Sequence, residues 1–384
     1  MSDVIAPGST IGILGAGQLG RMLAVCARQM GYRVAVFGGD QHSPCGQVSD
    51  LTWTGSLTDE DLVREFSNAC DVVTYEFENI PAITAAAVSE NSPLRPGVEL
   101  LRTAQNRFAE KTALTNLGLG TARFRMVSSA KELSAAREDF GGEVILKANT
   151  DGYDGKGQWS IGADDDVNAI WKNTDLSEAI VEERVSFEFE LSVIGGRYAD
   201  GNCSFYAPLL NHHENHILDV SISGASQVTS KITDEASQMT RAVLEHFDVV
   251  GVLCMELFLT TDGRLLVNEI APRPHNSGHL TIEAYNCSQF ELQLRTICNL
   301  PAVPLTRRAP AAAMANLLGQ HLPETWNART LEALSNPECH LHLYGKPEAR
   351  QNRKMGHVSL LHKDATAAEH TIRELRGHFS NASS

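Results

Sequence analysis

Residues 141–161 read GGEVILKANTDGYDGKGQWSI, and the predicted fold depends most on this stretch. An apolar run ends at Lys147, a loop rich in glycine follows, and QWSI predicts a second strand. Such a loop can bring backbone N–H groups to triphosphate oxygens, while its lysines supply the positive charge that phosphoryl transfer needs. The Walker A order is absent, and the loop holds more glycine than a simple hairpin turn with solvated lysines requires. The loop residues expected around a nucleotide are Gly152, Tyr153, Asp154, Gly155, Lys156, Gly157 and Gln158.

A second pair of strands follows about a hundred residues later, at 251–260 and 265–271, joined by the turn residues 261–263. Glu256 and Glu269 lie on the two arms of this hairpin, with Asn268 beside the latter. Carboxylates on adjacent strands can converge on Mg²⁺, which prefers oxygen ligands and keeps phosphate oxygens in its shell. The period of two places the neighbours of Glu256 on the opposite face. The alternative is a pair of solvated glutamates at a sheet edge.

Two further polar stretches accompany these strands. EERV, residues 182–185, ends a strand and could offer backbone and carboxylate groups to an adenine and a ribose, but a solvated acidic turn is the better interpretation of these residues alone. The run 273–279, RPHNSGH, crowds polar side chains between fixed prolines, as loops at binding sites do. His212, His213 and His216 suggest zinc, but no fourth ligand stands at a typical spacing, so an exposed polar loop is the better interpretation.

The N-terminal residues 10–40 follow the pattern strand, glycine turn, helix, strand, which predicts a βαβ unit. Gly15, Gly17 and Gly20 form GxGxxG, with Asp40 about twenty residues further on. The motif is compatible with a nucleotide cofactor, with another phosphate, or with a tight turn that binds nothing. The first ~100 residues therefore predict a doubly wound α/β layer.

Composition sets the outer limits of function. The chain has 384 residues, enough for several domains, with 42% hydrophobic and 21% charged residues, as in globular proteins. A formal net charge of −15 argues against a nucleic-acid partner. No apolar run reaches the roughly 18 residues of a membrane span, and no signal peptide precedes the first strand. We therefore expect a cytoplasmic protein, with no membrane partner and with scattered cysteines as buried free thiols.

Taken together, these stretches resemble the 5-(carboxyamino)imidazole ribonucleotide synthases, ATP-grasp ligases of bacterial and fungal purine biosynthesis. The most specific match is NEIAPRPHNSGHLTIEA, residues 268–284. GILGAGQLGRMLA and TYEFENIP match near the front of the chain, and HLYGK and RKMGHV match near its end. The resemblance implies an α/β ATP-grasp fold of three domains. These are an N-terminal Rossmann-like domain, an ATP-grasp domain with a glycine lid and a small β-rich C-terminal domain, at residues 1–103, 104–300 and 301–384.

The resemblance also implies a reaction in which ATP, bicarbonate and 5-aminoimidazole ribonucleotide give the N5-carboxyamino product, ADP and phosphate through carboxyphosphate. Besides the loop 152–158, the implied ATP contacts are Arg107, Lys147, Glu182, Glu183, Arg184, Val185, Glu190, His213, Asn268 and Glu269. Mg²⁺ is expected on Glu256 and Glu269. The implied ribonucleotide contacts are Gly17, Gln18, Leu19, Tyr153, Asp154, Arg273, His275, Asn276, Lys346 and Arg353. The catalytic candidates are Asp154, Arg273 and His275, the first and last as possible general bases, and the expected assembly is a homodimer.

Other functions compete with this interpretation. A formate-dependent glycinamide ribonucleotide transformylase or a biotin carboxylase shares the ATP-grasp features but is expected to lack HLYGK followed by RKMGHV. An NAD-dependent oxidoreductase rests on the front glycines alone and leaves Glu256, Glu269 and the lysine loop unexplained. A non-catalytic nucleotide-binding module would not need both carboxylates, both lysines and the HNSGH cluster together.

Overall fold

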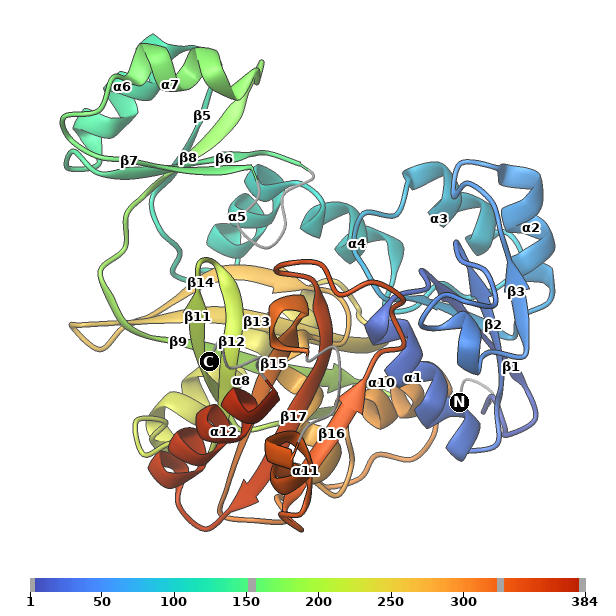
Figure 1. Cartoon of the computed structure of the whole chain (residues 1–384). Helices are drawn as coiled ribbons and strands as arrows, with labels where there is room; N and C mark the ends of the chain where they lie inside the picture. Colours follow the sequence, from blue (N-terminus) through green and yellow to red (C-terminus); the bar gives the residue numbers. More distant parts are fainter. Residues whose placement is uncertain (1–3, 151–156, 323–327, 380–384) are drawn as a thin grey trace.

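The structure, a computed structural model, describes residues 4–150, 157–322 and 328–379. Three β-sheets organise these residues into the mixed α/β architecture that the sequence predicts. Figure 1 shows a parallel sheet with helices on both of its faces, a large sheet in the centre and a small sheet that projects as a separate lobe. The space where these three parts meet is the natural position for a site.

The N-terminal layer is a parallel sheet in the order β3-β2-β1-β4, which confirms the doubly wound pattern. Its strands are β1 (Thr10–Leu14), β2 (Arg33–Phe37), β3 (Leu51–Trp53) and β4 (Val72–Tyr75). Its helical segments are α1 (Gln18–Gln29), η1 (Gly46–Val48), α2 (Glu60–Asn68), α3 (Ala82–Ser89) and α4 (Val98–Ala104). All five residues of β1 are buried, as expected for a central parallel strand covered by helices on both faces.

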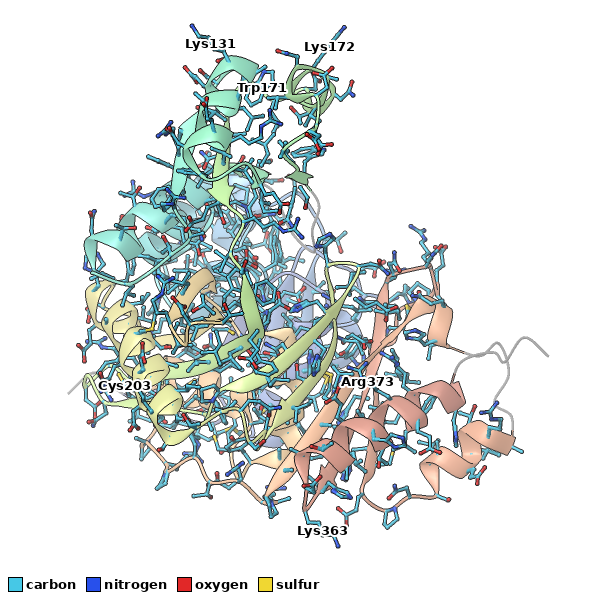
Figure 2. The ribbon with its side chains drawn as sticks, turned by 90° about the vertical axis from the view of Figure 1, so that its left-hand side faces the viewer. Lys131, Trp171, Lys172, Cys203, Lys363 and Arg373 are labelled. Atoms are coloured by element: carbon cyan, nitrogen blue, oxygen red, sulfur yellow. The ribbon has the colours of Figure 1, made fainter. Side chains whose placement is uncertain are left out.

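The projecting lobe is a small antiparallel sheet in the order β5-β8-β6-β7. Its elements are β5 (Phe124–Val127), α6 (Ala130–Asp139), β6 (Val144–Ala148), β7 (Gln158–Ile161), α7 (Val167–Thr174) and β8 (Ala179–Glu183). β6 pairs with β7, which confirms the strands predicted on either side of the glycine loop. Lys131, Trp171 and Lys172 lie at the outer end of the lobe (Figure 2). Helix α5 (Arg107–Asn116) contacts both β5 and β14, so it joins the lobe to the large sheet.

The large sheet has the strand order β14-β13-β9-β11-β12-β15-β17-β16, and β10 pairs with β9 beside this path. Its first strands are β9 (Phe187–Arg197), β10 (Cys203–Phe205), β11 (Leu209–Glu214), β12 (Ile217–Ser223), β13 (Gly251–Thr260) and β14 (Leu265–Ala271). Its helical segments up to residue 297 are α8 (Ser230–His246), η2 (Asn276–Leu280), α9 (Thr281–Ala284) and α10 (Gln289–Ile297). The antiparallel hairpin predicted from residues 251 to 271 is β13 and β14.

The C-terminal segment continues this sheet. Its elements are β15 (Ala311–Leu318), η3 (Gly319–His321), α11 (Ala328–Leu334), β16 (Cys339–Leu343), β17 (Lys354–His362) and α12 (Ala365–Phe379). β15 pairs with β12, with Ala315 opposite Val220, so these strands share a sheet with the preceding segment. The C-terminal part is β-rich as expected, and its side chains share one apolar core with the central segment. The boundaries near residues 103 and 300 therefore remain predictions.

Helix α10 ties the N-terminal layer to the large sheet. Its Phe290 and Leu294 pack in the same buried cluster as Leu23 of α1. Gln293 of the same helix has a buried amide, which donates to Thr74 Oγ1 of β4 at 2.8 Å and accepts the Val252 N–H of β13 at 2.7 Å. These contacts hold the glycine turn before α1 against the central part of the molecule. In the described ranges no helix is long and apolar enough to cross a membrane.

Candidate active site

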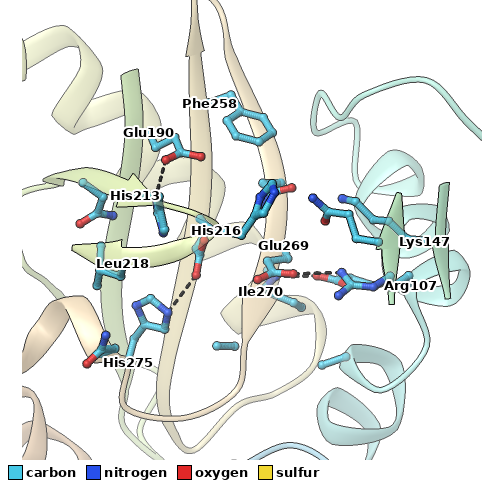
Figure 3. A pocket seen from close by; sticks show the side chains of 18 of the residues that line it. Arg107, Lys147, Glu190, His213, His216, Leu218, Phe258, Glu269, Ile270 and His275 are labelled. Carbon is cyan, nitrogen blue, oxygen red and sulfur yellow. Dashed lines mark hydrogen bonds and ion pairs between the residues drawn. The ribbon is translucent and has the colours of Figure 1, made fainter. Parts of the chain in front are cut away.

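A cavity of about 1140 Å³ lies where the three parts of the molecule meet. Residues of the N-terminal layer, the lobe, α5 and the large sheet all line it, as do residues of the 273–279 run. Figure 3 shows Arg107 and Lys147 on one side of this space, with His213 and His275 on the other. Most of the site residues predicted from the sequence therefore lie in one cavity.

The two carboxylates expected to hold a metal lie directly opposite each other. Glu256 of β13 pairs in register with Glu269 of β14, and both line the cavity. Met255 and Leu257 face the apolar core, as the strand period predicted. The register shifts after Glu256, so Leu257 pairs with Val267 and Asn268 is the extra residue of a β-bulge. A bulge re-aims side chains, which lets the consecutive Asn268 and Glu269 both reach the cavity.

Both carboxylates already have cationic partners. His275 Nε2 lies 2.8 Å from Glu256 Oε1, and Arg107 Nη1 lies 3.0 Å from Glu269 Oε2. Burial alone would lower the pKa of His275, but the Cys254 side chain and the Glu256 carboxylate raise it to about 10. The pairing with Glu256 favours the protonated form of His275, whereas a general base must be unprotonated, and its expected use as a general base remains a prediction. The other candidate base, Asp154, lies outside the described residues.

Lys147 and Glu182 form a buried ion pair at the lobe side of the cavity. Lys147 Nζ donates to Glu182 Oε2 at 2.9 Å, and Lys111 Nζ lies 3.5 Å from the same oxygen. Burial would raise the pKa of Glu182, but the charges of Lys147 and Lys111 lower it to about 2. The solvated acidic turn considered for EERV is therefore wrong for Glu182, which is buried, although Glu183 bonds the half-exposed Arg123. Arg184 and Val185 line the cavity as expected.

Glu190 and His213 approach each other from β9 and β11 and form an ion pair at the cavity. Burial would lower the pKa of His213, but the hydrogen bond and charge of Glu190 raise it. The histidines thus belong to a strand and its hairpin rather than to a loop: His212 and His213 lie on β11, and His216 lies at the turn. Among the described residues no group of three or more His, Cys, Asp or Glu side chains forms a metal site.

Sequence reasoning missed an aromatic wall. Phe187 and Phe258 stack with ring centroids 4.5 Å apart and an interplanar angle of 13°, and both line the cavity. Phe258 is two residues after Glu256, so strand alternation alone could have placed it on the cavity face. Phe187 begins β9, where no such pattern precedes it. Flat aromatic surfaces of this kind suit a purine ring.

The glycine turn binds an anion from the chain itself. The N–H groups of Gly17 and Gly20 both donate to the Glu76 carboxylate, the second at 2.7 Å. Burial raises the pKa of Glu76, although these backbone hydrogen bonds oppose the change. The N–H groups of Gly17 and Gly20, which the glycine motif could present to a phosphate, are therefore already hydrogen-bonded to Glu76. Gln18 and Leu19 line the cavity.

Arg273 is also held by an acidic residue of the N-terminal layer. Its Nε and Nη2 donate to the two Glu78 oxygens at 2.5 and 2.9 Å. Asn276 is buried at the cavity wall, and neither its amide oxygen nor its amide nitrogen has a hydrogen-bond partner among the described residues. An amide with both groups unpaired is suited to bind a polar ligand.

The C-terminal cations are placed differently from expectation. Lys354 of β17 lines the cavity, whereas the set of lining residues includes neither Lys346 nor Arg353. Lys346 Nζ donates to the Lys354 carbonyl at 2.6 Å, and its charge opposes the rise of the Glu76 pKa that burial causes. Arg353 donates to the Glu348 carbonyl at 3.1 Å. Of the loop residues, Gln158 lines the cavity and the Gly157 carbonyl accepts the Ala148 N–H, while 152–156 lie outside the described residues.

Comparison with protein families assigns each part of the chain. The model of the ribonucleotide synthetase preATP-grasp domain matches residues 8–105, and that of the ATP-grasp domain matches 112–290. The model of the phosphoribosylaminoimidazole carboxylase C-terminal domain matches residues 312–371.

Individual proteins match over nearly the whole length. The N5-carboxyaminoimidazole ribonucleotide synthase of Bacillus subtilis is 40% identical over 359 residues, which cover 94% of this chain and 93% of that protein. A crystal structure of an N5-carboxyaminoimidazole ribonucleotide synthetase with ADP superposes with a TM-score of 0.92 at 39% identity, covering 98% of each chain. The Aspergillus clavatus enzyme with ADP and 5-aminoimidazole ribonucleotide gives 0.88 at 31% identity, covering 97% of this chain and 98% of that one. This chain belongs to the N5-carboxyaminoimidazole ribonucleotide synthase family of ATP-grasp ligases.

Proposed function

We propose that this chain carboxylates 5-aminoimidazole ribonucleotide on its 5-amino group, using ATP and bicarbonate and releasing ADP and phosphate. The observation that carries the proposal is the single cavity that brings together Lys147, the Glu256–Glu269 pair and the Gln18–Leu19 turn. A phosphate-binding lysine, a metal-binding pair and a second substrate surface must share one space if a phosphorylated intermediate is to react before it meets water. The Aspergillus clavatus relative was solved with ADP and the ribonucleotide together, which supports two adjacent substrate sites.

The proposed reaction has two steps. A bicarbonate oxygen attacks the γ-phosphorus of ATP, the bond to the ADP oxygen breaks, and carboxyphosphate and ADP result. The 5-amino nitrogen then attacks the carboxyl carbon, the carbon–oxygen bond to phosphate breaks, and the nitrogen loses a proton. Both steps build negative charge on oxygen, which fixed cations stabilise. Arg273 and His275 are suited to this role, because both are cations held in place by carboxylates at the cavity.

We propose that Glu256 and Glu269 hold Mg²⁺, with the Asn268 amide beside them. The donor set fits, because two carboxylates on paired strands leave most of the shell to phosphate oxygens and water. When bound, Mg²⁺ would neutralise charge on the ATP phosphates. His275 and Arg107 hold the two carboxylates in position, and each can also contact a phosphate or carboxylate oxygen once that charge is shared.

The nucleotide is proposed to lie between the lobe and the large sheet. Phe187 and Phe258 would face the adenine, the Glu190 carboxylate would accept from ribose hydroxyls, and Lys147 would meet the phosphates. His213, paired with Glu190, would hold that carboxylate in position. The remaining expected ATP contacts, Arg107, Gly157, Gln158, Glu182, Glu183, Arg184 and Val185, and the loop 152–156, remain part of the proposal.

The ribonucleotide is proposed to lie against the N-terminal layer. Gln18, Leu19 and Asn276 line this end of the cavity, and the unpaired Asn276 amide can bind its polar groups. Its phosphate requires a cation, and the candidates are Lys354 at the cavity together with the expected Lys346 and Arg353. Because Glu76 occupies the N–H groups of Gly17 and Gly20, the turn is proposed to contact the neutral part of this substrate rather than its phosphate.

A phosphate-release assay tests the proposal. Purified protein with ATP, Mg²⁺ and bicarbonate should release phosphate much faster when 5-aminoimidazole ribonucleotide is added, and omission of bicarbonate should remove the increase. Manganese or no metal in place of Mg²⁺ tests the choice of ion in the same assay. Formate with glycinamide ribonucleotide tests the related transformylase. Activity with that pair, and none with the proposed substrates, would overturn the assignment.

We also propose a cytoplasmic homodimer, as the family resemblance implies. Light scattering coupled to size-exclusion chromatography measures the assembly directly. A mass near 41.8 kDa at micromolar concentration would exclude the dimer, because that is the mass of one chain.

A further inference from the structure

Lys111 is a fully buried cation that the reaction scheme does not use. It lies on α5 with its side chain 2% exposed, and it does not line the cavity. Its ammonium lies 3.5 Å from Glu182 Oε2, and its other hydrogen bond, to the Val267 carbonyl, is long at 3.4 Å. Burial lowers the pKa of Lys111, although the charge of Glu182 opposes this. An apolar residue would fill such a position without the cost of removing an ammonium from water, so the charge itself calls for an explanation.

The explanation lies in the oxygen that Lys111 shares. Glu182 Oε2 is also the partner of Lys147 Nζ, at 2.9 Å, and the other oxygen, Oε1, is buried with no hydrogen bond among the described residues. One carboxylate therefore faces two ammonium groups, Lys147 at the cavity and Lys111 behind it. Glu110, the neighbour of Lys111, accepts the Ile270 N–H, and its charge adds to that of Glu182 in opposing the fall of the Lys111 pKa that burial causes.

The helix that carries Lys111 serves both sides of the site. Arg107 and Lys111 are four residues apart on α5, so they lie on one face of the helix, one turn from each other. Arg107 pairs with Glu269 of β14, and Lys111 pairs with Glu182 of β8. α5 lies between the small sheet of the lobe and the large sheet, and it brings one cation to an acidic residue of each.

The charges of Lys147, Glu182 and Lys111 together determine how strongly this side of the cavity attracts a polyphosphate. Lys147 and Glu182 alone would be a neutral pair, and the polyphosphate would have to compete with Glu182 for the Lys147 ammonium. With Lys111 the group of three carries one net positive charge, and Lys147 is the cation of this group that lines the cavity. We propose that Lys111 is a positioning residue for ATP, which holds Glu182 from behind and so leaves the charge of Lys147 available to the phosphates. This inference rests on the proposed role of Lys147 in ATP binding.

Equilibrium binding of a non-hydrolysable ATP analogue with Mg²⁺ tests this proposal without the ribonucleotide. Lys111→Met should weaken binding about tenfold or more, as expected when one charge-assisted contact is weakened. Lys111→Arg, which keeps the charge, should bind nearly as the parent does. Steady-state kinetics should show the KM for ATP rising while the KM for 5-aminoimidazole ribonucleotide stays within about twofold. Equal rises for both substrates would overturn the proposal.

A double variant separates charge balance from simple loss of packing. In Lys111→Met with Glu182→Gln both buried charges are absent, so Lys147 regains a free positive charge. Its analogue affinity should exceed that of Lys111→Met and match that of Glu182→Gln alone. The comparison of the double variant with Glu182→Gln remains available if Lys111→Met does not fold, because these two variants differ only at residue 111 and neither contains the Glu182 carboxylate. A further loss in the double variant relative to Glu182→Gln would refute action through Glu182.

Arg376→Met is the matched control. Arg376 of α12 forms a partly buried ion pair with Asp219, and neither residue lines the cavity. The control should lower the unfolding midpoint and leave analogue binding unchanged, whereas a loss of binding like that of Lys111→Met would assign the effect to destabilisation. If the parent protein itself binds no ATP analogue, the proposed function and the role of Lys111 both fail. If the parent binds it and Lys111→Met binds it equally well, only the role of Lys111 fails.

Discussion

The ion pair between Glu78 and Arg273 links the N-terminal layer to the run that follows β14, and its loss gives a sharp test. Both Glu78 oxygens accept from the guanidinium, and the two side chains are 28% and 16% exposed. Glu78→Gln leaves the Arg273 charge without its counter-ion in a mostly buried site. Such a loss costs about 3–5 kcal/mol when burial is complete, and partial exposure reduces the expected loss of unfolding free energy to about 1–3 kcal/mol.

Denaturant unfolding measures this loss, and Glu90→Gln is the control. Glu90 belongs to the same layer and pairs with Arg64 at 2.9 Å, but its side chain is 55% exposed, so its removal should leave the unfolding free energy nearly unchanged. Glu78→Gln should also lower kcat/KM for the ribonucleotide or bicarbonate more than that for ATP, because Glu78 holds Arg273 beside the N-terminal layer, where the ribonucleotide is proposed to bind. Equal losses of unfolding free energy in the two variants would refute the argument.

The same pair predicts a pH dependence. Burial would raise the pKa of Glu78, but the charge and hydrogen bonds of Arg273 lower it below 4.5. A carboxyl group with a lowered pKa stabilises the fold above its unfolded pKa, and this contribution is lost as the pH falls through the folded pKa. The difference in unfolding free energy between the parent and Glu78→Gln should therefore have its maximum value near pH 6 and decrease below about pH 4.5. A difference that grows toward low pH would contradict this sign.

Three further predictions concern the substrates. Glu256→Ala and Glu269→Ala should each lower kcat by about a hundredfold or more at limiting Mg²⁺ while the protein stays folded, and near-normal turnover would exclude the metal assignment. Arg353→Ala should raise the KM for 5-aminoimidazole ribonucleotide by roughly ten- to a hundredfold and leave that for ATP unchanged; if Lys354→Ala gives the larger rise, Lys354 is the phosphate ligand. Phe258→Ala should raise the KM for ATP by about three- to tenfold, and a normal KM would remove the aromatic wall from the adenine site.

Local patterns predicted the parts of the site that depend on neighbours in the chain. Glu256 could be assigned to the cavity face because strand alternation places Met255 and Leu257 in the core. The hairpin that pairs it with Glu269 follows from a short turn between two apolar runs. The bulge at Asn268 could not be predicted, because it exists only in the pairing of the two strands.

Long-range partners could not be predicted. Glu78 and Arg273 are 195 residues apart, and nothing in TYEFENIP marks Glu78 as the counter-ion of a particular arginine. No local pattern around Lys111 indicates that its partner is Glu182, because the two residues meet only in the folded protein. The C-terminal strands were expected, but their pairing with β12 depends on a register that no local pattern contains.

The glycine turn shows why a motif alone does not identify its partner. Tight backbone geometry and N–H groups at the start of α1 were compatible with a nucleotide, with another phosphate or with no ligand, and the structure places an anion of the chain itself there. That anion is the Glu76 carboxylate, which comes from the end of the neighbouring parallel strand β4. A substrate phosphate at this turn would have to displace a carboxylate that two N–H groups already bind, and the two negative charges would repel each other. The phosphate must therefore find its cations elsewhere in the cavity, which is why the comparison of Arg353 with Lys354 is the informative experiment on this substrate.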